Sequence, residues 1–336
     1  MPNINLKNLA KELGVSISTV SKSLKDSHEI STETKERVVA YAKKIGYSPN
    51  PYAGFLRHHK SKTIALIAPE LNNNYFIQAI SGAETVAQEK DYHLLIYCTN
   101  DDFQKEASIL KDLTNGRVDG VLISLTSNTI SYDHINNLIN AGIPVVFFDR
   151  VCHEIETAKV TTDDFTSGFN ATEHLIKKGC KNIAFISASE NLSICNKRKQ
   201  GYLEALAKNN ILENPNRIIV CDSDETNNAQ KIKDLFQSNI KTDAVFASIE
   251  RLALTTYNVC NELNINIPRD KKIICFSNLR TAALLNPSLT TITQPAFEMG
   301  KQAAIILFKS LEKKKIKIFN ENIILKSELI ERNSTK

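Results

Sequence analysis

Several kinds of segment are missing from this sequence, and each absence excludes a class of protein. No run of about 18 apolar residues occurs, so no membrane-spanning helix is predicted. The N-terminal residues contain no apolar region of the kind that directs export, so we expect a cytoplasmic protein without membrane contact. No glycine-rich phosphate loop of the GxGxxG or GxxxxGK[ST] type follows an expected strand, so no nucleotide cofactor is predicted.

The residues that build metal and catalytic sites are present but scattered. The seven cysteines form no CxxC pair and no Cys/His spacing suited to a metal ion, and several lie inside apolar runs. They indicate reduced, buried thiols rather than disulfides or a zinc site. None of the seven histidines pairs with a glycine-flanked serine nucleophile, so an enzyme is the disfavoured alternative.

What the sequence does contain is a pair of short helical patterns near its N-terminus, in LKNLAKELGVSISTVSKSLK at 6–25. Apolar residues recur at helical spacing on both sides of Gly14, and Ser16 is suited to cap the second helix. Two such helices are typical of a helix-turn-helix, whose second helix enters the major groove of DNA. A plain helical hairpin in a bundle is the alternative. The segments that surround residues 6–25 decide between these two interpretations.

The distribution of charge favours the DNA-binding interpretation. Residues 1–62 contain 11 Lys and Arg against 5 Asp and Glu, a net charge of +6, whereas the other 274 residues have a net charge of −1. A basic segment attached to a neutral remainder is the electrostatic pattern of a protein that binds a polyanion.

A third amphipathic helix is predicted from Ser31 to Gly46, and it completes an all-α headpiece at 1–48. The segment 49–61 follows, with prolines on both sides of Asn50 and room for at most two helical turns interrupted by a glycine. So short a helix is not stable alone in water, so we expect this hinge to fold only where DNA holds it.

From residue 63 onward, short apolar runs rich in valine and isoleucine alternate with helical stretches. This alternation predicts parallel β-sheets with helices on both faces. Two similar half-chains in succession predict an α/β core of two doubly wound lobes. Because ligands of such folds bind beyond the carboxyl ends of the strands, the cleft between the lobes is the expected binding site.

Seven motifs, in order along the chain, carry a resemblance to a known family. They are LAKELGVSISTVSKSL, NPYAGFLR, GIPVVFFDR, the HLIKKG–NIAF junction, RKQGYLEAL, LTTITQPAFEMGKQAAIIL and LKSELIERNST. With them the chain resembles LacI/GalR-type bacterial repressors over residues 4–335.

The resemblance implies a core like that of periplasmic binding proteins, in which the chain crosses between the lobes three times. It implies a first lobe at 62–160 plus 293–326 and a second lobe at 161–292. The strand near 290–294 and the helix that follows it would then return to the first lobe.

The second helix carries the side chains expected to contact DNA in the major groove. The residues expected at base edges are Ile17, Ser18, Ser21 and Lys22. Lys22 stands where the family usually has arginine, so a phosphate contact without sequence information is its alternative. Ser16 and Ser31 are expected to bind phosphates or to cap their helices.

The hinge matches the family's minor-groove helix. The resemblance implies that Leu56 is a wedge between base steps, with Ala53 beside it and Asn50 at the start of the helix. Ordinary packing between headpiece and core is the alternative for Leu56.

Polar and aromatic residues at expected strand ends are the candidates for effector binding. They are Phe76, Ser124, Asp149, Arg198, Asn278 and Gln294. A carboxylate, a guanidinium and an amide converging in one cleft suit the vicinal hydroxyls of a sugar or an acidic sugar. A helix cap or a lobe-to-lobe pair is the alternative for Asp149, and Arg150 is expected to be structural.

Together these features predict a sequence-specific transcriptional regulator, expected to act as a repressor. Its predicted partners are double-stranded operator DNA, a second copy of the chain, and a sugar-like effector that controls operator affinity. A small-molecule receptor without a DNA function is the second alternative, and the basic headpiece argues against it. The sequence does not identify the effector or the operator. It also leaves open whether the effector releases the protein from DNA or recruits it, and whether the protein is a dimer or a tetramer.

Overall fold

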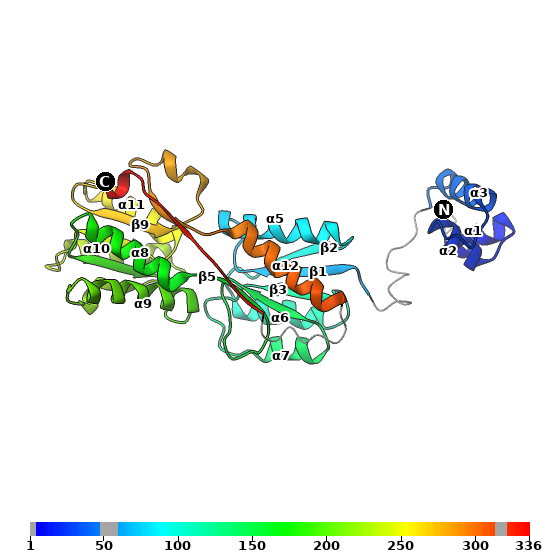
Figure 1. The fold of residues 1–336 in the computed structure, drawn as a ribbon, viewed down its shortest axis with the longest axis horizontal. Helices are drawn as coiled ribbons and strands as arrows, with labels where there is room; N and C mark the ends of the chain where they lie inside the picture. Colours follow the sequence, from blue (N-terminus) through cyan, green and yellow to red (C-terminus); the bar gives the residue numbers. More distant parts are fainter. Residues whose placement is uncertain (1–4, 48–59, 313–320) are drawn as a thin grey trace. The chain divides into compact units, whose positions relative to one another are not determined.

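The computed structural model describes residues 5–47, 60–312 and 321–336. The chain divides into two compact units, a headpiece unit at 1–61 and a core unit at 62–336 (Figure 1). In the described ranges, no helix combines the length and the apolar character that crossing a bilayer requires.

The headpiece is the predicted bundle of three short helices. They are α1 (Leu6–Leu13), α2 (Ile17–Leu24) and α3 (Thr32–Lys44). One apolar cluster holds them together, with Leu9, Ala10, Val20, Val38 and Ala42 at its buried centre. The turn between α1 and α2 passes through a glycine with φ of 63°, a left-handed conformation that costs glycine little.

The first lobe of the core contains a six-stranded, wholly parallel sheet. In spatial order its strands are β11 (Asn322–Leu325), β5 (Lys159–Thr162), β4 (Val145–Phe148), β3 (Gly120–Ile123), β1 (Thr63–Ala68) and β2 (His93–Cys98). Its helices are α5 (Asn74–Glu89), α6 (Phe103–Leu113), α7 (Asp133–Asn140) and α12 (Ala296–Glu312).

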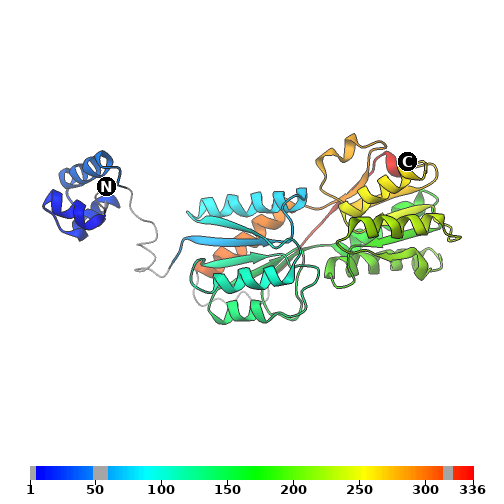
Figure 2. The ribbon, with the colours of Figure 1, turned by 180° about the vertical axis from the view of Figure 1, so that it is seen from behind.

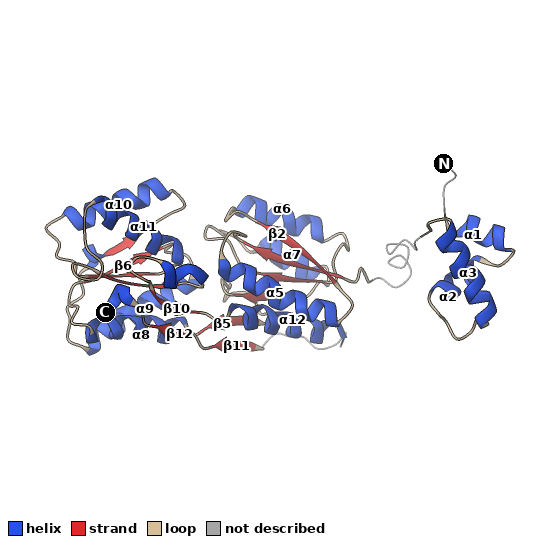
Figure 3. Cartoon of the chain, turned by 90° about the horizontal axis from the view of Figure 1, so that it is seen from above, coloured by secondary structure: helices blue, strands red, loops and turns tan. Residues whose placement is uncertain are grey.

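Strand β1 shows why the apolar runs in this sequence are continuous. Ile64 and Leu66 face a core formed with α5 and α12, whereas Ala65 and Ile67 face a second core formed with α6 and α7. Side chains alternate between the two faces of a strand, so a sheet covered on both faces buries every residue. Figure 1 shows α5 on one side of these strands and α6 and α7 on the other, and Figure 3 looks onto the face of the sheet.

The second lobe repeats this plan. In spatial order its strands are β12 (Glu328–Ile330), β10 (Thr290–Thr293), β9 (Lys272–Phe276), β8 (Ala244–Ala247), β6 (Ile183–Ser187) and β7 (Ile218–Val220). Its α-helices are α8 (Asp164–Lys177), α9 (Ser193–Lys208), α10 (Glu225–Gln237) and α11 (Glu250–Glu262), and its 3-10 helices are η1 (Pro215–Arg217), η2 (Arg280–Leu284) and η3 (Asn333–Thr335). Only the edge strand β12 is antiparallel to its neighbour among these described strands.

The chain crosses between the lobes three times, and the crossing segments appear as green, orange and red ribbon in Figures 1 and 2. Two expected boundaries need correction. Strand β5 stays in the first sheet up to Thr162, rather than leaving it at 160, because Thr162 pairs with Leu325 of β11. Strand β10 belongs to the second sheet, not the first, because its last residue, Thr293, pairs with Glu328 of β12.

The C-terminal residues therefore complete the second lobe after β11 completes the first. Among the described residues of the expected segment 293–326, helix α12 and strand β11 return to the first lobe. All seven cysteines are free and six of them are buried, whereas Cys98 at the end of β2 is half-buried.

Candidate functional site

Helix α2 presents the predicted DNA-contacting side chains away from the headpiece core. Ser16 caps it, because the backbone N–H of Thr19 donates to Ser16 Oγ over 3.0 Å. Val20 is buried, while Ile17 is 46% exposed and Ser18 is exposed. An exposed isoleucine at the start of a helix is available to pack on a base edge, and the contact itself remains a prediction.

Two lysines of the headpiece are partnered by acidic side chains within the chain. Lys22 forms an ion pair with Glu29, and Lys35 Nζ lies 2.8 Å from Asp26 Oδ1. The hydrogen bond from Lys35 lowers the pKa of Asp26. Exposed pairs of this kind are weak, so the Lys22 ammonium can leave Glu29 for a base or a phosphate.

Ser31 caps α3 in the same way as Ser16 caps α2, because the Thr34 N–H donates to Ser31 Oγ over 3.4 Å. The predicted hinge residues Asn50, Ala53 and Leu56 lie outside the described residues. Their contacts with DNA remain predictions from the resemblance alone.

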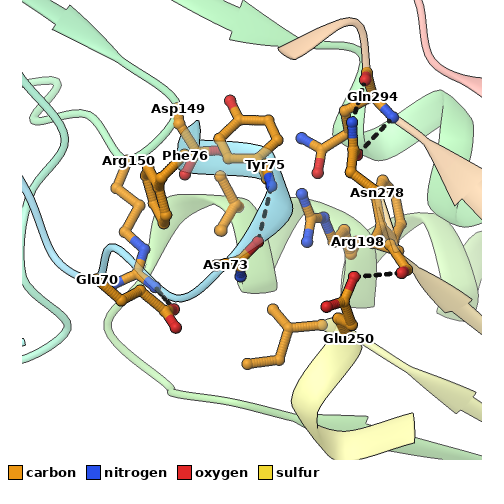
Figure 4. A pocket seen from close by; sticks show the side chains of 14 residues that line it. Glu70, Asn73, Tyr75, Phe76, Asp149, Arg150, Arg198, Glu250, Asn278 and Gln294 are labelled. Atoms are coloured by element: carbon orange, nitrogen blue, oxygen red, sulfur yellow. Dashed lines mark hydrogen bonds and ion pairs between the residues drawn. The ribbon is translucent and has the colours of Figure 1, made fainter. Parts of the chain in front are cut away.

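In the core, one cavity collects most of the predicted effector residues (Figure 4). Its lining residues are Glu70, Asn73, Tyr75, Phe76, Asp149, Arg150, Ile194, Arg198, Ile249, Glu250, Phe276, Ser277, Asn278 and Gln294. They come from strand ends and helix starts of both lobes, as the fold class predicts.

Five of the six predicted effector residues line this cavity, namely Phe76, Asp149, Arg198, Asn278 and Gln294. Ser124 does not. It is fully buried, and its hydroxyl lies 3.5 Å from the backbone nitrogen of Arg150, so it supports the strand-end loop rather than the cavity wall.

Sequence reasoning missed several wall residues. Tyr75 directly precedes Phe76, and Asn73 and Glu70 lie in the same loop after β1, so the rule that selected Phe76 could have found them. Phe276 is the last residue of β9, immediately before the Ser277-Asn278 pair.

Arg198 of α9 forms a buried ion pair with Asp164, the first residue of α8. Its Nε donates to Asp164 Oδ1 over 2.8 Å, and its Nη1 donates to the Ser248 carbonyl over 2.6 Å. Its guanidinium carbon lies 3.6 Å from the centre of the Phe276 ring. Its Nη2 is buried and has no hydrogen-bond partner in the described chain, so this nitrogen is the free donor of Arg198.

Two glycines bring α8 and α9 close enough for this pair to form. A Cβ atom at Gly201 of α9 would lie 2.2 Å from the Phe165 carbonyl oxygen of α8. A Cβ atom at Gly168 of α8 would lie 2.5 Å from the Arg198 carbonyl oxygen. Both distances are far below a van der Waals contact, so larger residues at these positions would separate the helices.

Asp149 is the buried carboxylate of the cavity. It follows β4 in a left-handed conformation with φ of 61°, and its side chain is 5% exposed. Burial raises the pKa of Asp149 to about 6, although Arg150 and Arg198 oppose this effect. Burial, with the charge of Asp149 beside it, also raises the pKa of Tyr75. The Tyr75 hydroxyl lies beside the Asp149 carboxylate and has no other polar partner in the described chain.

Arg150 belongs to a second charged group at the wall. Its Nη1 donates to Asp101 Oδ1 over 2.8 Å, and its Nη2 lies 3.6 Å from Glu70 Oε1. Asp101 also accepts from the backbone N–H of Ser127 over 2.8 Å. These contacts support the structural role expected for Arg150.

The side-chain amides of Asn278 and Gln294 connect segments of the chain that cross between the two lobes. Asn278 Nδ2 donates to the Gln294 carbonyl over 2.8 Å, and the Gln294 amide nitrogen Nε2 donates to Thr162 Oγ1 over 3.1 Å. Thr162 ends the last strand before the first crossing, so Gln294 joins two crossings at the cavity. Gln294 therefore lies where two of the segments that cross between the lobes meet.

Glu250 begins α11 and accepts a hydrogen bond from the Ser277 hydroxyl. Burial raises its pKa. No group of three or more His, Cys, Asp or Glu side chains in the described part of the chain is placed to hold a metal ion.

Comparison with known proteins connects these sites to one family. A family model described as "Periplasmic binding proteins and sugar binding domain of LacI family" matches residues 61–326. A second, "Bacterial regulatory proteins, lacI family", matches residues 5–50. The HTH-type transcriptional regulator RegA of Clostridium saccharobutylicum is 31% identical over 98% of this chain and 99% of its own length.

Solved structures agree with this assignment. A LacI family transcriptional regulator from Enterococcus faecium with bound ribose is 27% identical, with a TM-score of 0.71 over 81% of this chain and 98% of that chain. The Lac repressor dimer bound to operator and the anti-inducer ONPF is 20% identical, with a TM-score of 0.84 over 99% of each chain, and shows the shared fold. The chain therefore belongs to the LacI family and is a DNA-binding transcriptional regulator with a helix-turn-helix headpiece and a core of the sugar-binding type.

Proposed function

We propose that this regulator binds a polyhydroxyl ligand, a sugar or a sugar derivative, in the cavity between its core lobes, and that this ligand controls its affinity for operator DNA. The observation that carries the proposal is the set of unsatisfied polar atoms in the cavity. Arg198 Nη2 and Arg150 Nε are buried there without partners among the described residues, and the Tyr75 hydroxyl has only the Asp149 carboxylate beside it. Buried polar groups are normally paired, so these atoms fit a ligand that supplies the missing hydrogen bonds.

The remaining wall suits the same ligand. The side chains of Phe76 and Phe276 make part of the wall apolar, while Asp149 accepts and Asn278 and Gln294 can donate and accept. Apolar walls with a few convergent polar groups are typical of small-molecule sites. The Enterococcus faecium relative has ribose bound in its structure, which is consistent with this class of ligand.

We propose that the functional form is a homodimer on a nearly palindromic operator. Each chain offers one recognition helix of eight residues, and two half-sites matched to a two-fold axis supply the specific affinity that one helix lacks. A regulator of this kind acts in the compartment that contains the DNA.

The coupling between cavity and DNA would run through the lobes and the hinge. A ligand held by Asp149 of the first lobe and Arg198 of the second fixes the angle between the lobes. In a dimer this angle sets the separation of the two hinges, and with it whether Leu56 of each chain enters the minor groove. The ligand is bound rather than transformed in this scheme.

The experiment is a thermal-shift screen of the full chain against neutral sugars, sugar acids and sugar phosphates. A ligand at a hundred times its dissociation constant adds about 2.7 kcal/mol to the free energy of unfolding. Each compound that stabilises the chain is then tested for its effect on DNA binding. Stabilisation without any change in DNA affinity would contradict the regulatory role, and stabilisation by no compound would contradict the ligand class.

A further inference from the structure

The two arginines of the cavity wall are already occupied by acidic side chains of the chain itself. Arg198 uses Nε for Asp164 and Nη1 for a backbone carbonyl, which leaves one free nitrogen. Arg150 uses Nη1 for Asp101, its Nη2 lies 3.6 Å from Glu70, and its Nε is buried without a partner among the described residues. A carboxylate or a phosphate is bound most strongly by two adjacent N–H groups of one guanidinium. In each adjacent pair on either arginine, at least one nitrogen already bonds to or faces an acceptor of the chain.

The wall is also negative in formal charge. Three carboxylates line the cavity, namely Glu70, Asp149 and Glu250, and no lysine lines it. Asp101 and Asp164 bond to the two arginines and bring the number of carboxylates at the site to five, against two guanidinium groups.

The positively polarised N-termini of the helices at the wall do not offset this negative charge. The positive end of α5 is capped by Asn73, whose side-chain oxygen accepts from the Tyr75 N–H over 2.9 Å. The positive end of α11 begins with Glu250 itself, so a carboxylate already occupies it. An anionic ligand would gain little from either helix.

The free polar atoms suit hydroxyl groups instead. A hydroxyl can accept from Arg198 Nη2 and at the same time donate to Asp149, and the hydroxyl of Tyr75 can take either role. We propose, resting on the ligand-binding function proposed above, that the cavity accepts an uncharged polyol and rejects the carboxylate and phosphate derivatives of the same compound. Asp164 and Asp101 set this selectivity as positioning residues, because each occupies an arginine edge that would otherwise bind an anion.

The test measures the binding of matched probes to the full chain by titration calorimetry. The probes are D-ribose with ribonate and ribose 5-phosphate, and D-glucose and D-galactose with their uronates and 6-phosphates. We expect at least one neutral sugar to bind, and its two anionic derivatives to bind at least about tenfold more weakly. An anionic derivative that binds as tightly as its parent overturns the selectivity but leaves the ligand-binding function in place. If no probe of any charge binds, the proposed function fails, and this inference fails with it.

Two substitutions separate selectivity from mere structural support. Asp164→Asn keeps an oxygen that can accept from Arg198 Nε but removes the charge, and Asp101→Asn does the same beside Arg150. Each should raise the affinity for the anionic derivative relative to that for the neutral sugar by about tenfold. Asp112→Asn, at an exposed carboxylate of α6, is the matched control and should leave this ratio unchanged.

A purely structural role for Asp164 or Asp101 would weaken all probes alike and leave the ratio unchanged, and that result overturns the inference. The melting temperature of each variant shows whether it is folded. If one of the two does not fold, the ratio measured for the other decides.

Discussion

Asp149→Asn separates the stability of this protein from its proposed function. The substitution removes the buried charge, keeps the size of the side chain, and places asparagine in a left-handed conformation that asparagine tolerates well. We expect the variant to be more stable than the natural chain and to lose most of its affinity for the ligand.

The expected gain follows from the pKa of Asp149. Its value of about 6, against 3.8 for an unperturbed aspartate, is a difference of about two units. Each unit corresponds to about 1.4 kcal/mol, so the charged carboxylate costs about 3 kcal/mol of folding free energy at neutral pH. The raised pKa means that the folded chain holds this proton more tightly than the unfolded chain does. Stability from this group is therefore complete below pH 3.8, falls as the pH rises to about 6, and is constant above that value.

The assay is urea unfolding of the full chain and of the Asp149→Asn variant, from about pH 4 to about pH 8. Asp164 and Glu250 also have raised pKa values, so the difference between the two proteins isolates the contribution of Asp149. We expect this difference to favour the variant by about 3 kcal/mol at pH 7 and to shrink steadily as the pH falls from about 6 to about 4. Asp112→Asn should follow the natural chain at every pH.

A variant that is no more stable than the natural chain at pH 7, or a difference that does not change with pH, would refute this reasoning. A carboxylate that lowers stability where it lies is expected at a functional site, because function rather than folding explains its presence.

Three further predictions concern other parts of the chain. Lys22→Ala should weaken binding to the operator by roughly 1–3 kcal/mol and relax discrimination if Lys22 contacts a base; equal losses on operator and random DNA in anisotropy titrations would assign it to a phosphate instead. Arg198→Ala should destabilise the core by about 3–5 kcal/mol, because it leaves Asp164 buried without its partner, and a melting curve like that of the natural chain would exclude such a cost. Gly300→Ala should destabilise the first lobe by at least about 1–3 kcal/mol, since its Cβ would lie 1.8 Å from a carbonyl oxygen of α5; unfolding at an unchanged urea concentration would contradict that packing.

The prediction for Arg198 changes the design of functional experiments. The sequence suggests Arg198→Ala as the variant that abolishes the ligand response. The structure shows that this side chain also neutralises a buried carboxylate, so a lost response could reflect lost stability. Asp149→Asn removes a wall group without leaving another charge unpaired.

Local rules were sufficient to predict most of the fold from the sequence. Ser16 and Ser31 cap their helices as predicted. Most of the continuous apolar runs form strands buried on both faces, whereas the edge strands β2 and β7 are partly exposed. The location of β10 was not predictable in this way, because a short buried strand fits either sheet equally well. Its place is set by pairing with β9 and β12, which is a long-range interaction.

The cavity could be predicted in part for the same reason. The strand-end rule found Asp149 and Gln294, because in a parallel sheet all carboxyl ends lie on one side. It failed for Ser124, since the rule fixes where a residue lies but not which way its side chain points. It could not show that Asp164 holds Arg198, because that contact depends on how closely α8 and α9 pack.

The central claim is that one ligand in the core cavity controls DNA binding, and a reciprocal titration tests it most directly. The affinity of the full chain for an operator selected from random DNA is measured with and without the ligand from the thermal-shift screen, and the affinity for that ligand is measured with and without the operator. We predict that both affinities change by the same factor, about 5-fold to 150-fold, and that Asp149→Asn abolishes both changes while still binding the operator. A ligand that binds the natural chain tightly, yet leaves operator affinity unchanged, would contradict the account.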